Sequence, residues 1–161
     1  NYVRESHIKE YPVKSKRSAR IHSSFEAMFY EETSLSLPDT SLEDQLTNIG
    51  PSFHDKLFEL IDKSHLDNKD VWKRANLDRK LFSKIQCNKN YHPKKKTVLA
   101  LCIALKLNLE ESKDLLARAD WAFSPSSKVD LIVQKAIIDK QYDIMELNIT
   151  LFKYTNETLG I

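Results

Sequence analysis

The stretch VWKRANLDRKLFSKI, residues 71–85, interrupts a run of charged side chains with a large apolar side chain every few positions. Apolar residues at intervals of three and four are typical of amphipathic helices. Asn76 tolerates the left-handed backbone of a tight turn, and Asp78 is a favourable helix N-cap. The stretch therefore predicts two short helices, one over residues 69–75 and one from Asp78 to about Gln86. Their charged side is either a solvated surface or a surface that binds a polyanion.

Charge is distributed unevenly along the 161 residues. Residues 69–106 hold eleven basic and two acidic side chains, so this segment carries +9 although the whole chain carries only +2. Residues 21–50 hold six acidic side chains and no Lys or Arg, which gives −6, and residues 1–20 carry +4. A local positive field of this kind suggests a polyanionic partner. On charge alone, a solvated basic face explains the segment equally well.

The rest of the chain carries mainly helical signals. Only two glycines and five prolines occur, which favours helices over strands and tight turns. After Gly50 and Pro51, Ser52 and Asp55 have capping-box spacing, and Asn108 is expected to end a helix. That helix begins near Pro93 or Lys94, and one of its faces holds the apolar side chains of Val98, Leu101, Cys102 and Leu105.

These signals predict an all-α fold with three parts. Residues 1–50 form a linker or arm that is basic and then acidic, residues 51–119 a five-helix domain, and residues 120–161 a C-terminal helical extension. We expect the extension to hold helices over 128–139 and 143–153 and to end in a frayed segment, TNETLGI. Within the arm, Ser24 and Ser41 would each cap a short helix. The arm either docks on a partner, covers the +9 segment and inhibits it, or is a disordered tether.

Residues 53–119 resemble a lambda-repressor-like, Cro-type helix-turn-helix domain. The core pattern of that family is an apolar and a small residue in the second helix, a glycine turn, an apolar residue, and a Ser-rich recognition helix. VWKRANLDRKLFSKIQ overlays this pattern without a gap. Val71 takes the first apolar position, Ala75 the last position of the second helix, and Leu77 the buried position after the turn. Asn76 stands where the family has glycine.

The resemblance continues on both sides of that turn. Leu81 or Phe82, and then Ile85, would fix the third helix, and Gln86 stands where the family often has Glu. The stretch TVLALCIALKLNLEES, residues 97–112, is similar to the family's next helix and its closing apolar turn.

The resemblance implies duplex DNA binding, in transcription regulation or in directing a larger protein to DNA. The third helix would lie in the major groove, where a bidentate contact from Arg79 to guanine is worth about 1–3 kcal/mol of discrimination. The base-reading residues would be Arg79, Lys80, Ser83 and Lys84. Phosphate contacts set orientation and affinity rather than sequence preference, and they would come from Lys69, Lys73, Lys89, Tyr91, Lys94, Lys95 and Lys96. Members of the family often form homodimers, for which the last two helices or the acidic arm would supply the interface.

Two residues depart from the family pattern. Trp72 stands where the family prefers a small residue, so its indole must point outward or the two helices must separate. Asp78 places a carboxylate where a Ser would approach the phosphates, which stabilises the helix but repels DNA. These departures keep open a second interpretation, in which the helix-turn-helix is a protein-interaction module that regulates an absent N-terminal domain.

A second resemblance indicates what such a domain would be. The segments ANLDRKLFSKI (75–85), residues 97–119 and SSKVDLIVQKAI (126–137) look like the C-terminal module that follows macrodomains in some bacterial proteins. The opening NYV resembles the end of a macrodomain, and the chain does not begin with Met, so we expect a fragment of a longer protein. Any ADP-ribose binding or ADP-ribosyl hydrolysis would belong to that other part.

Catalytic and cofactor motifs are not found. The five histidines lack metal-ligand spacing, and two glycines cannot build a phosphate-binding or nucleophile loop. We therefore expect no enzyme activity, no metal and no cofactor. Cys87 and Cys102 form no recognisable pair, which fits the reducing cytoplasm. No apolar run approaches ~18 residues, so we expect no membrane span.

Overall fold

The computed structural model describes residues 41–160, and every regular element in that range is an α-helix. The chain divides into two units, Asn1–Ile49 and Gly50–Ile161. Within the first unit, Ser41 caps a short helix as expected, whereas the helix expected after Ser24 lies outside the described residues. The helices are α2 (Leu42–Thr47), α3 (Phe53–Ser64), α4 (Asn68–Arg74), α5 (Arg79–Cys87), α6 (Lys95–Ala104), α7 (Leu109–Arg118), α8 (Lys128–Ile138) and α9 (Ile144–Thr155).

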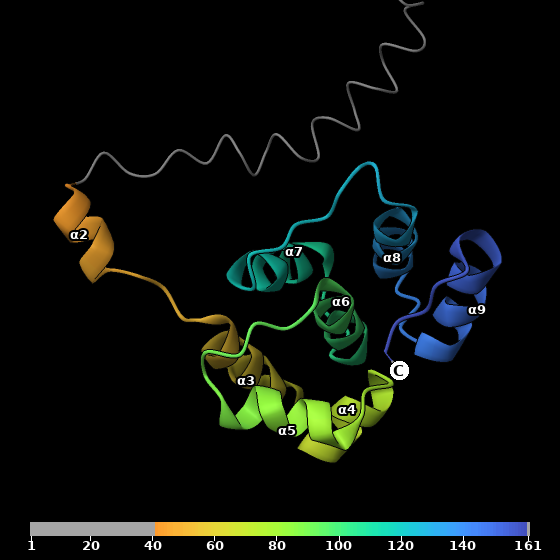
Figure 1. Cartoon of the computed structure of the whole chain (residues 1–161), viewed down its shortest axis with the longest axis horizontal. Coiled ribbons are helices and arrows are strands. Elements are labelled where there is room, and N and C mark those ends of the chain that lie inside the picture. The colour runs from red at the N-terminus through yellow and green to blue at the C-terminus, as the bar shows by residue number, and fades with distance from the viewer. Residues whose placement is uncertain (1–40, 161) are drawn as a thin grey trace, which may run out of the picture. The chain divides into compact units, whose positions relative to one another are not determined.

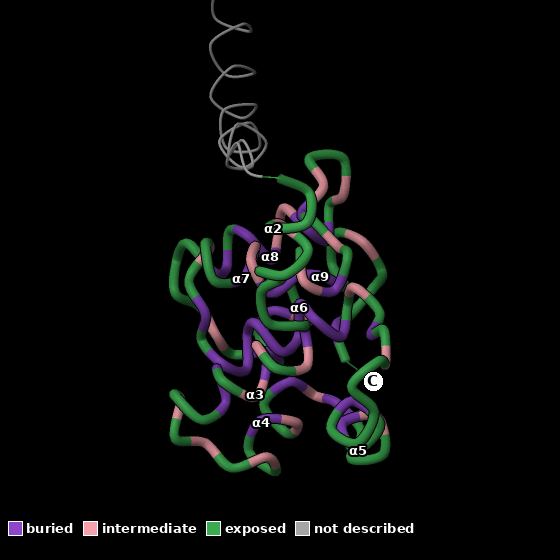
Figure 2. The backbone as a smooth tube through the Cα atoms, turned by 90° about the vertical axis from the view of Figure 1, so that its left-hand side faces the viewer, coloured by how far each residue is buried: buried purple, intermediate pink, exposed green. Residues whose placement is uncertain are grey.

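Helix α6 is the centre of the second unit. It contacts α4, α7 and α9, and α7 in turn contacts α3 and α8 (Figure 1). We expected α6 to bury one apolar face, but every residue from Thr97 to Ala104 is buried, so the helix is covered on all sides. A helix that is apolar all round is stable only when neighbours cover every side. Figure 2 shows the resulting pattern, with the buried residues gathered in the middle of the unit.

Side-chain caps fix where most helices begin. Ser52 accepts a hydrogen bond from Asp55 N, as its spacing predicts, and Ser127 and Asp143 cap α8 and α9 in the same way. Asn108 does not end α6, as the sequence suggested. It begins α7 instead, in a reciprocal capping box with Glu111. Such caps satisfy backbone N–H groups that have no partner within the helix.

The helices within residues 41–160 end without glycine. Asn76, Lys106, Asp120 and Lys140 all have φ between 53° and 63° and follow α4, α6, α7 and α8. In each case the next N–H donates to a carbonyl five residues back, for example Leu77 N to Trp72 O at 2.9 Å. This left-handed arrangement satisfies the last carbonyls of a helix. The turn predicted at Asn76 is confirmed.

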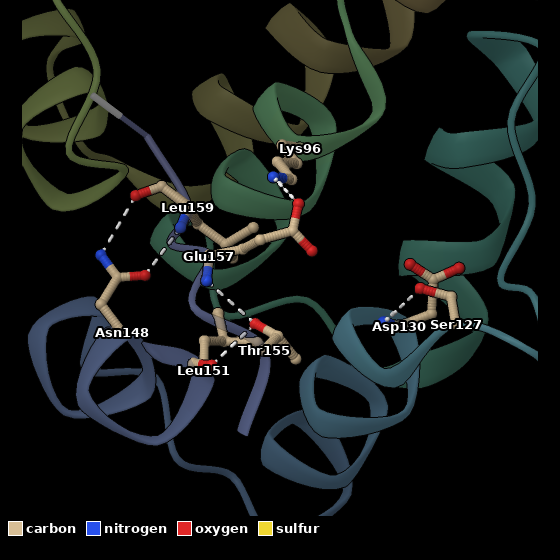
Figure 3. Close-up of polar contacts among 8 residues, drawn as sticks. All are labelled: Lys96, Ser127, Asp130, Asn148, Leu151, Thr155, Glu157 and Leu159. Atoms are coloured by element: carbon tan, nitrogen blue, oxygen red, sulfur yellow. Dashed lines mark hydrogen bonds and ion pairs between the residues drawn. The ribbon is translucent and has the colours of Figure 1, made fainter. Parts of the chain in front are cut away.

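The C-terminal segment is packed rather than frayed. Leu159 is fully buried, and its N–H donates to Asn148 Oδ1 at 2.7 Å (Figure 3). Its carbonyl accepts from Asn148 Nδ2 and from Asn76 Nδ2, at 3.1 and 3.3 Å. The prediction of fraying was wrong because a single leucine in a polar segment gives no periodic signal, while its burial here depends on residues distant in sequence.

Candidate nucleic-acid interface

Helices α4 and α5 are anchored by one buried side each. Helix α4 buries Val71 and its C-cap residue Ala75, and the turn that follows buries Leu77, as the sequence predicts. In α5 the choice between Leu81 and Phe82 is resolved, since Phe82 is buried and Leu81 is only half-buried. Together with the buried Ile85, this orientation leaves the opposite side of α5 exposed: Arg79, Lys80, Ser83 and Lys84.

Helix α3 holds α5 in place from the other side. His54 Nε2 donates a hydrogen bond to the carbonyl of Gln86 at 2.9 Å, and a carbonyl accepts only, so the proton is on Nε2. The rings of Phe58 and Phe82 meet edge to face, with their centroids 6.0 Å apart. Edge-to-face pairs add about 0.5–1.5 kcal/mol beyond the area they bury. The exposed side of α5 is therefore presented by a fixed helix.

A groove of about 630 Å³ lies along the exposed sides of α4 and α5. Its cationic lining comes from Lys69, Lys73 and Arg79, and no carboxylate lines it. Helix α4 contributes Asn68, Lys69, Trp72 and Lys73, and α5 contributes Arg79, Phe82, Ser83 and Gln86. The structure thus brings the expected base-reading residues Arg79 and Ser83 together with the expected phosphate-binding residues Lys69 and Lys73. Lys80 and Lys84 are exposed on α5 but do not line this groove.

Trp72 lies in this groove. Its side chain is half-buried, and Lys73 Nζ is 5.9 Å from the centroid of its ring. Of the two outcomes expected for this large residue, the indole lies outward, while Ala75 and Val71 make the close approach to the core. Together with Phe82, the ring adds apolar surface to a groove whose other lining residues are polar or positively charged.

Most of the basic side chains in this region have no ion pair within the described part of the chain. This group comprises Lys69, Lys73, Arg74, Arg79, Lys80, Lys84, Lys89 and Lys94. Cations without an ion-pair partner attract counter-charge from solution.

Lys95 and Lys96 differ from their neighbours because each has an acidic partner. Lys95 Nζ pairs with Asp130, which is 2% exposed and also accepts a hydrogen bond from Ser124 N at 2.7 Å. Lys96 Nζ lies 2.6 Å from Glu157 Oε1, in the C-terminal segment (Figure 3). These two ammonium groups fasten the start of α6 to α8 and to the C-terminal segment, so they are poorer candidates for phosphate contacts than Lys94.

The loop between α5 and α6 is fixed by aromatic contacts. Trp121 Nε1 donates to the carbonyl of Pro93 at 3.0 Å, and the rings of Trp121 and His92 lie 5.7 Å apart. His92 also lies 3.5 Å from Asp120, while Tyr91 is half-buried. Lys89 and Lys94 remain exposed on this loop.

Asp78 occupies the N-cap position of α5 but forms no capping hydrogen bond through its side chain. The corresponding Asp67 at the start of α4 does cap, accepting from Asp70 N at 2.9 Å, and this hydrogen bond lowers the pKa of the Asp67 carboxyl. The carboxylate of Asp78 is therefore exposed beside Arg79 without the stabilising bond that the sequence suggested.

Sequence reasoning missed Asn68 and Gln86 as parts of the groove. A signal was present, because Arg79, Ser83 and Gln86 recur at intervals of four and three and so share one side of a helix. The contacts of Lys95 and Lys96 had no comparable signal, since their partners lie 35 and 61 residues further along the chain.

Other chemistry has little support among residues 41–160. No group of three potential metal ligands gathers there, and none of the described helices is long and apolar enough to cross a membrane. Burial raises the pKa of the Cys102 thiol to about 12, so it is protonated at neutral pH and is a poor nucleophile. Cys87 is exposed.

Comparison with protein families, with curated proteins and with solved structures finds no match to this chain. The likeness to lambda-repressor-like domains therefore rests on the residues quoted above, and the function must be argued from the interface itself.

Proposed function

We propose that the protein binds duplex DNA through α5, with α3–α7 acting as a helix-turn-helix domain. The observation that carries this proposal is the groove along α4 and α5, which three basic side chains line and no carboxylate enters. Phosphates supply most of the affinity of DNA-binding proteins, and they require cations that are not already neutralised. The unpaired cations on α4, α5 and the following loop meet this requirement.

The roles of individual residues follow from their positions. Arg79 and Ser83 lie on the side of α5 that faces the groove, and α5 would read base edges through them. Lys80 and Lys84 flank this side. Phosphate contacts would come from Lys69 and Lys73 on α4 and from Lys89, Tyr91 and Lys94 on the loop. Lys95 and Lys96 have smaller roles in this scheme, because their ammonium groups already bind carboxylates.

Charge reversal on α5 tests the proposal. The double variant Arg79→Glu, Lys80→Glu is expected to bind mixed-sequence duplex DNA at least about tenfold more weakly. Phosphates supply the affinity for such DNA, and like charges placed against them cost several kcal/mol. Fluorescence anisotropy at low salt measures this directly. The control variant Lys128→Glu, Lys140→Glu makes the same change in net charge at two exposed lysines, one at the start of α8 and one in the turn after it. Equal weakening in both variants would show that only net charge matters and would remove α5 from the site.

A second candidate function is protein recognition through the same groove. Trp72 favours it, because a half-buried indole in a groove is typical of protein interfaces, where tryptophan is enriched. The exposed carboxylate of Asp78 points in the same direction. Under this alternative, the protein would bind no duplex DNA even at low salt. A protein complex would depend on Trp72, which lines the groove, and would tolerate charge reversal at Lys80, which does not.

A further inference from the structure

Helix α9 is apolar on two sides, although the fold covers only one of them. Its inner side, formed by Ile144, Leu147 and Leu151, is buried against the rest of the unit. Three other large apolar side chains remain exposed on the same helix: Met145 at 63%, Ile149 at 65% and Phe152 at 59%. A helix that packs on a core by one side needs only one apolar side.

The three exposed residues form a continuous stripe. Their spacing of four and then three residues places Met145, Ile149 and Phe152 on one side of the helix, one above the other. The stripe is also held rigidly, because Asn148 binds both the N–H and the carbonyl of Leu159. In Figure 1, α9 lies at the outer edge of its unit, with α6 and α8 on one side of it only.

Two opposite charges border the stripe on the same flank. Glu146 follows Met145 and Lys153 follows Phe152, so these two residues are two helical turns apart. Neither has an ion pair among residues 41–160, and Lys153 Nζ lies 5.2 Å from the centroid of the Tyr154 ring. When two α9 helices pack antiparallel about a two-fold axis, the flank that carries Glu146 and Lys153 on one copy lies beside the same flank of the other copy. The two flanks run in opposite directions. Glu146 of one copy then faces Lys153 of the other, twice.

We propose that the exposed stripe of α9 is a homodimer interface, with a second copy of this chain as its occupant. The charge pattern is what selects the second copy over an unrelated helix, because a two-fold interface must be complementary to itself. Three side chains cover less than the roughly 800 Å² per partner of a standard stable interface, so the dimer should be weak, with a Kd in the micromolar range. This inference does not rest on DNA binding.

Sedimentation velocity of the full chain without DNA, from about 1 to 300 µM, brackets a micromolar Kd and tests the interface. The sedimentation coefficient of the wild type should rise with concentration toward that of a dimer. Ile149→Asp should remain monomeric throughout, and its circular dichroism should be unchanged because the side chain is exposed. Ile138→Asp is the matched control, since it makes the same change at an exposed isoleucine of α8, at 53%, outside the stripe. This variant should dimerise like the wild type.

A charge exchange tests the antiparallel arrangement itself. Glu146→Lys and Lys153→Glu should each weaken the dimer by placing like charges together, and the double variant should restore it. A wild type that is monomeric at every concentration, or a dimer that survives Ile149→Asp, would overturn the proposal. Failure of the double variant to recover would overturn the antiparallel pairing. Because no DNA is present, none of these results depends on whether the protein binds it.

Discussion

Lys94, Lys95 and Lys96 are consecutive residues with different environments. Lys94 is exposed and has no ion pair among the described residues, whereas Lys95 keeps 24% of its side-chain surface and pairs with the buried Asp130. Sequence alone treats the three as one basic run. Lys95 differs from Lys94 because it pairs with Asp130, a buried carboxylate of α8. Lys95 and Lys96 therefore bind carboxylates within the fold, whereas Lys94 remains available to bind an anionic partner.

We expect Lys95→Met to lower the free energy of unfolding by about 3 kcal/mol, because it leaves the Asp130 carboxylate buried without its counter-charge. The effect falls at the lower end of the usual range since Lys95 is partly exposed. Lys94→Met is the matched control and should change stability by less than about 0.5 kcal/mol, as surface substitutions do. Urea denaturation measures both. Equal stabilities of the two variants would contradict the assignment of Lys95 as a structural cation.

Asp78 offers the opposite case, a charge that opposes the proposed function. Asp78→Asn should raise DNA affinity about two- to threefold, because it removes a carboxylate whose repulsion of nearby phosphates costs ~0.5 kcal/mol in high dielectric. Stability should change little, since no capping hydrogen bond is lost. Anisotropy and thermal unfolding measure the two effects, with Asp62→Asn on α3 as a control. Unchanged or weaker DNA binding would place Asp78 away from the phosphates.

The elements are where sequence reasoning succeeded most. Apolar residues at intervals of three and four, together with capping residues, located α4, α5, α8 and α9 to within a few residues. These are local signals, so they appear in a single sequence. Apart from two local errors, the role of Asn108 and the missing side-chain cap at Asp78, the errors concern contacts between distant parts of the chain. Burial of α6 on every side and of Leu159 depends on neighbours that no local pattern reveals.

The C-terminal segment is the element with the clearest consequence. Leu159→Ala should destabilise the protein by about 2–4 kcal/mol, because it removes a fully buried side chain and leaves a cavity. Thr158→Ala, at an exposed neighbouring position, should be nearly neutral. Thermal or urea unfolding distinguishes them. A neutral Leu159→Ala would mean that the segment frays in solution, as the sequence first suggested.

At the scale of the whole molecule, the proposed function depends on the distribution of charge more than on its sum. A net charge of +2 conceals a segment of +9 whose cations gather on α4, α5 and the following loop. The sequence showed this segment and predicted four of the residues that line the groove, Lys69, Lys73, Arg79 and Ser83, because charge and helical spacing are both visible in it. It did not predict which lysines are neutralised, nor that Trp72 lies in the groove, because both depend on packing.

The salt dependence of duplex DNA binding tests the central claim most directly. Fluorescence anisotropy of the full chain with mixed-sequence duplex at about 50 and 200 mM salt should show affinity falling ~10³-fold or more, if six or more phosphates are contacted. That result would establish a phosphate-binding surface and justify a search for a preferred sequence. Absence of binding even at 50 mM salt, or binding indifferent to salt, would contradict the proposal and assign the groove to a protein partner.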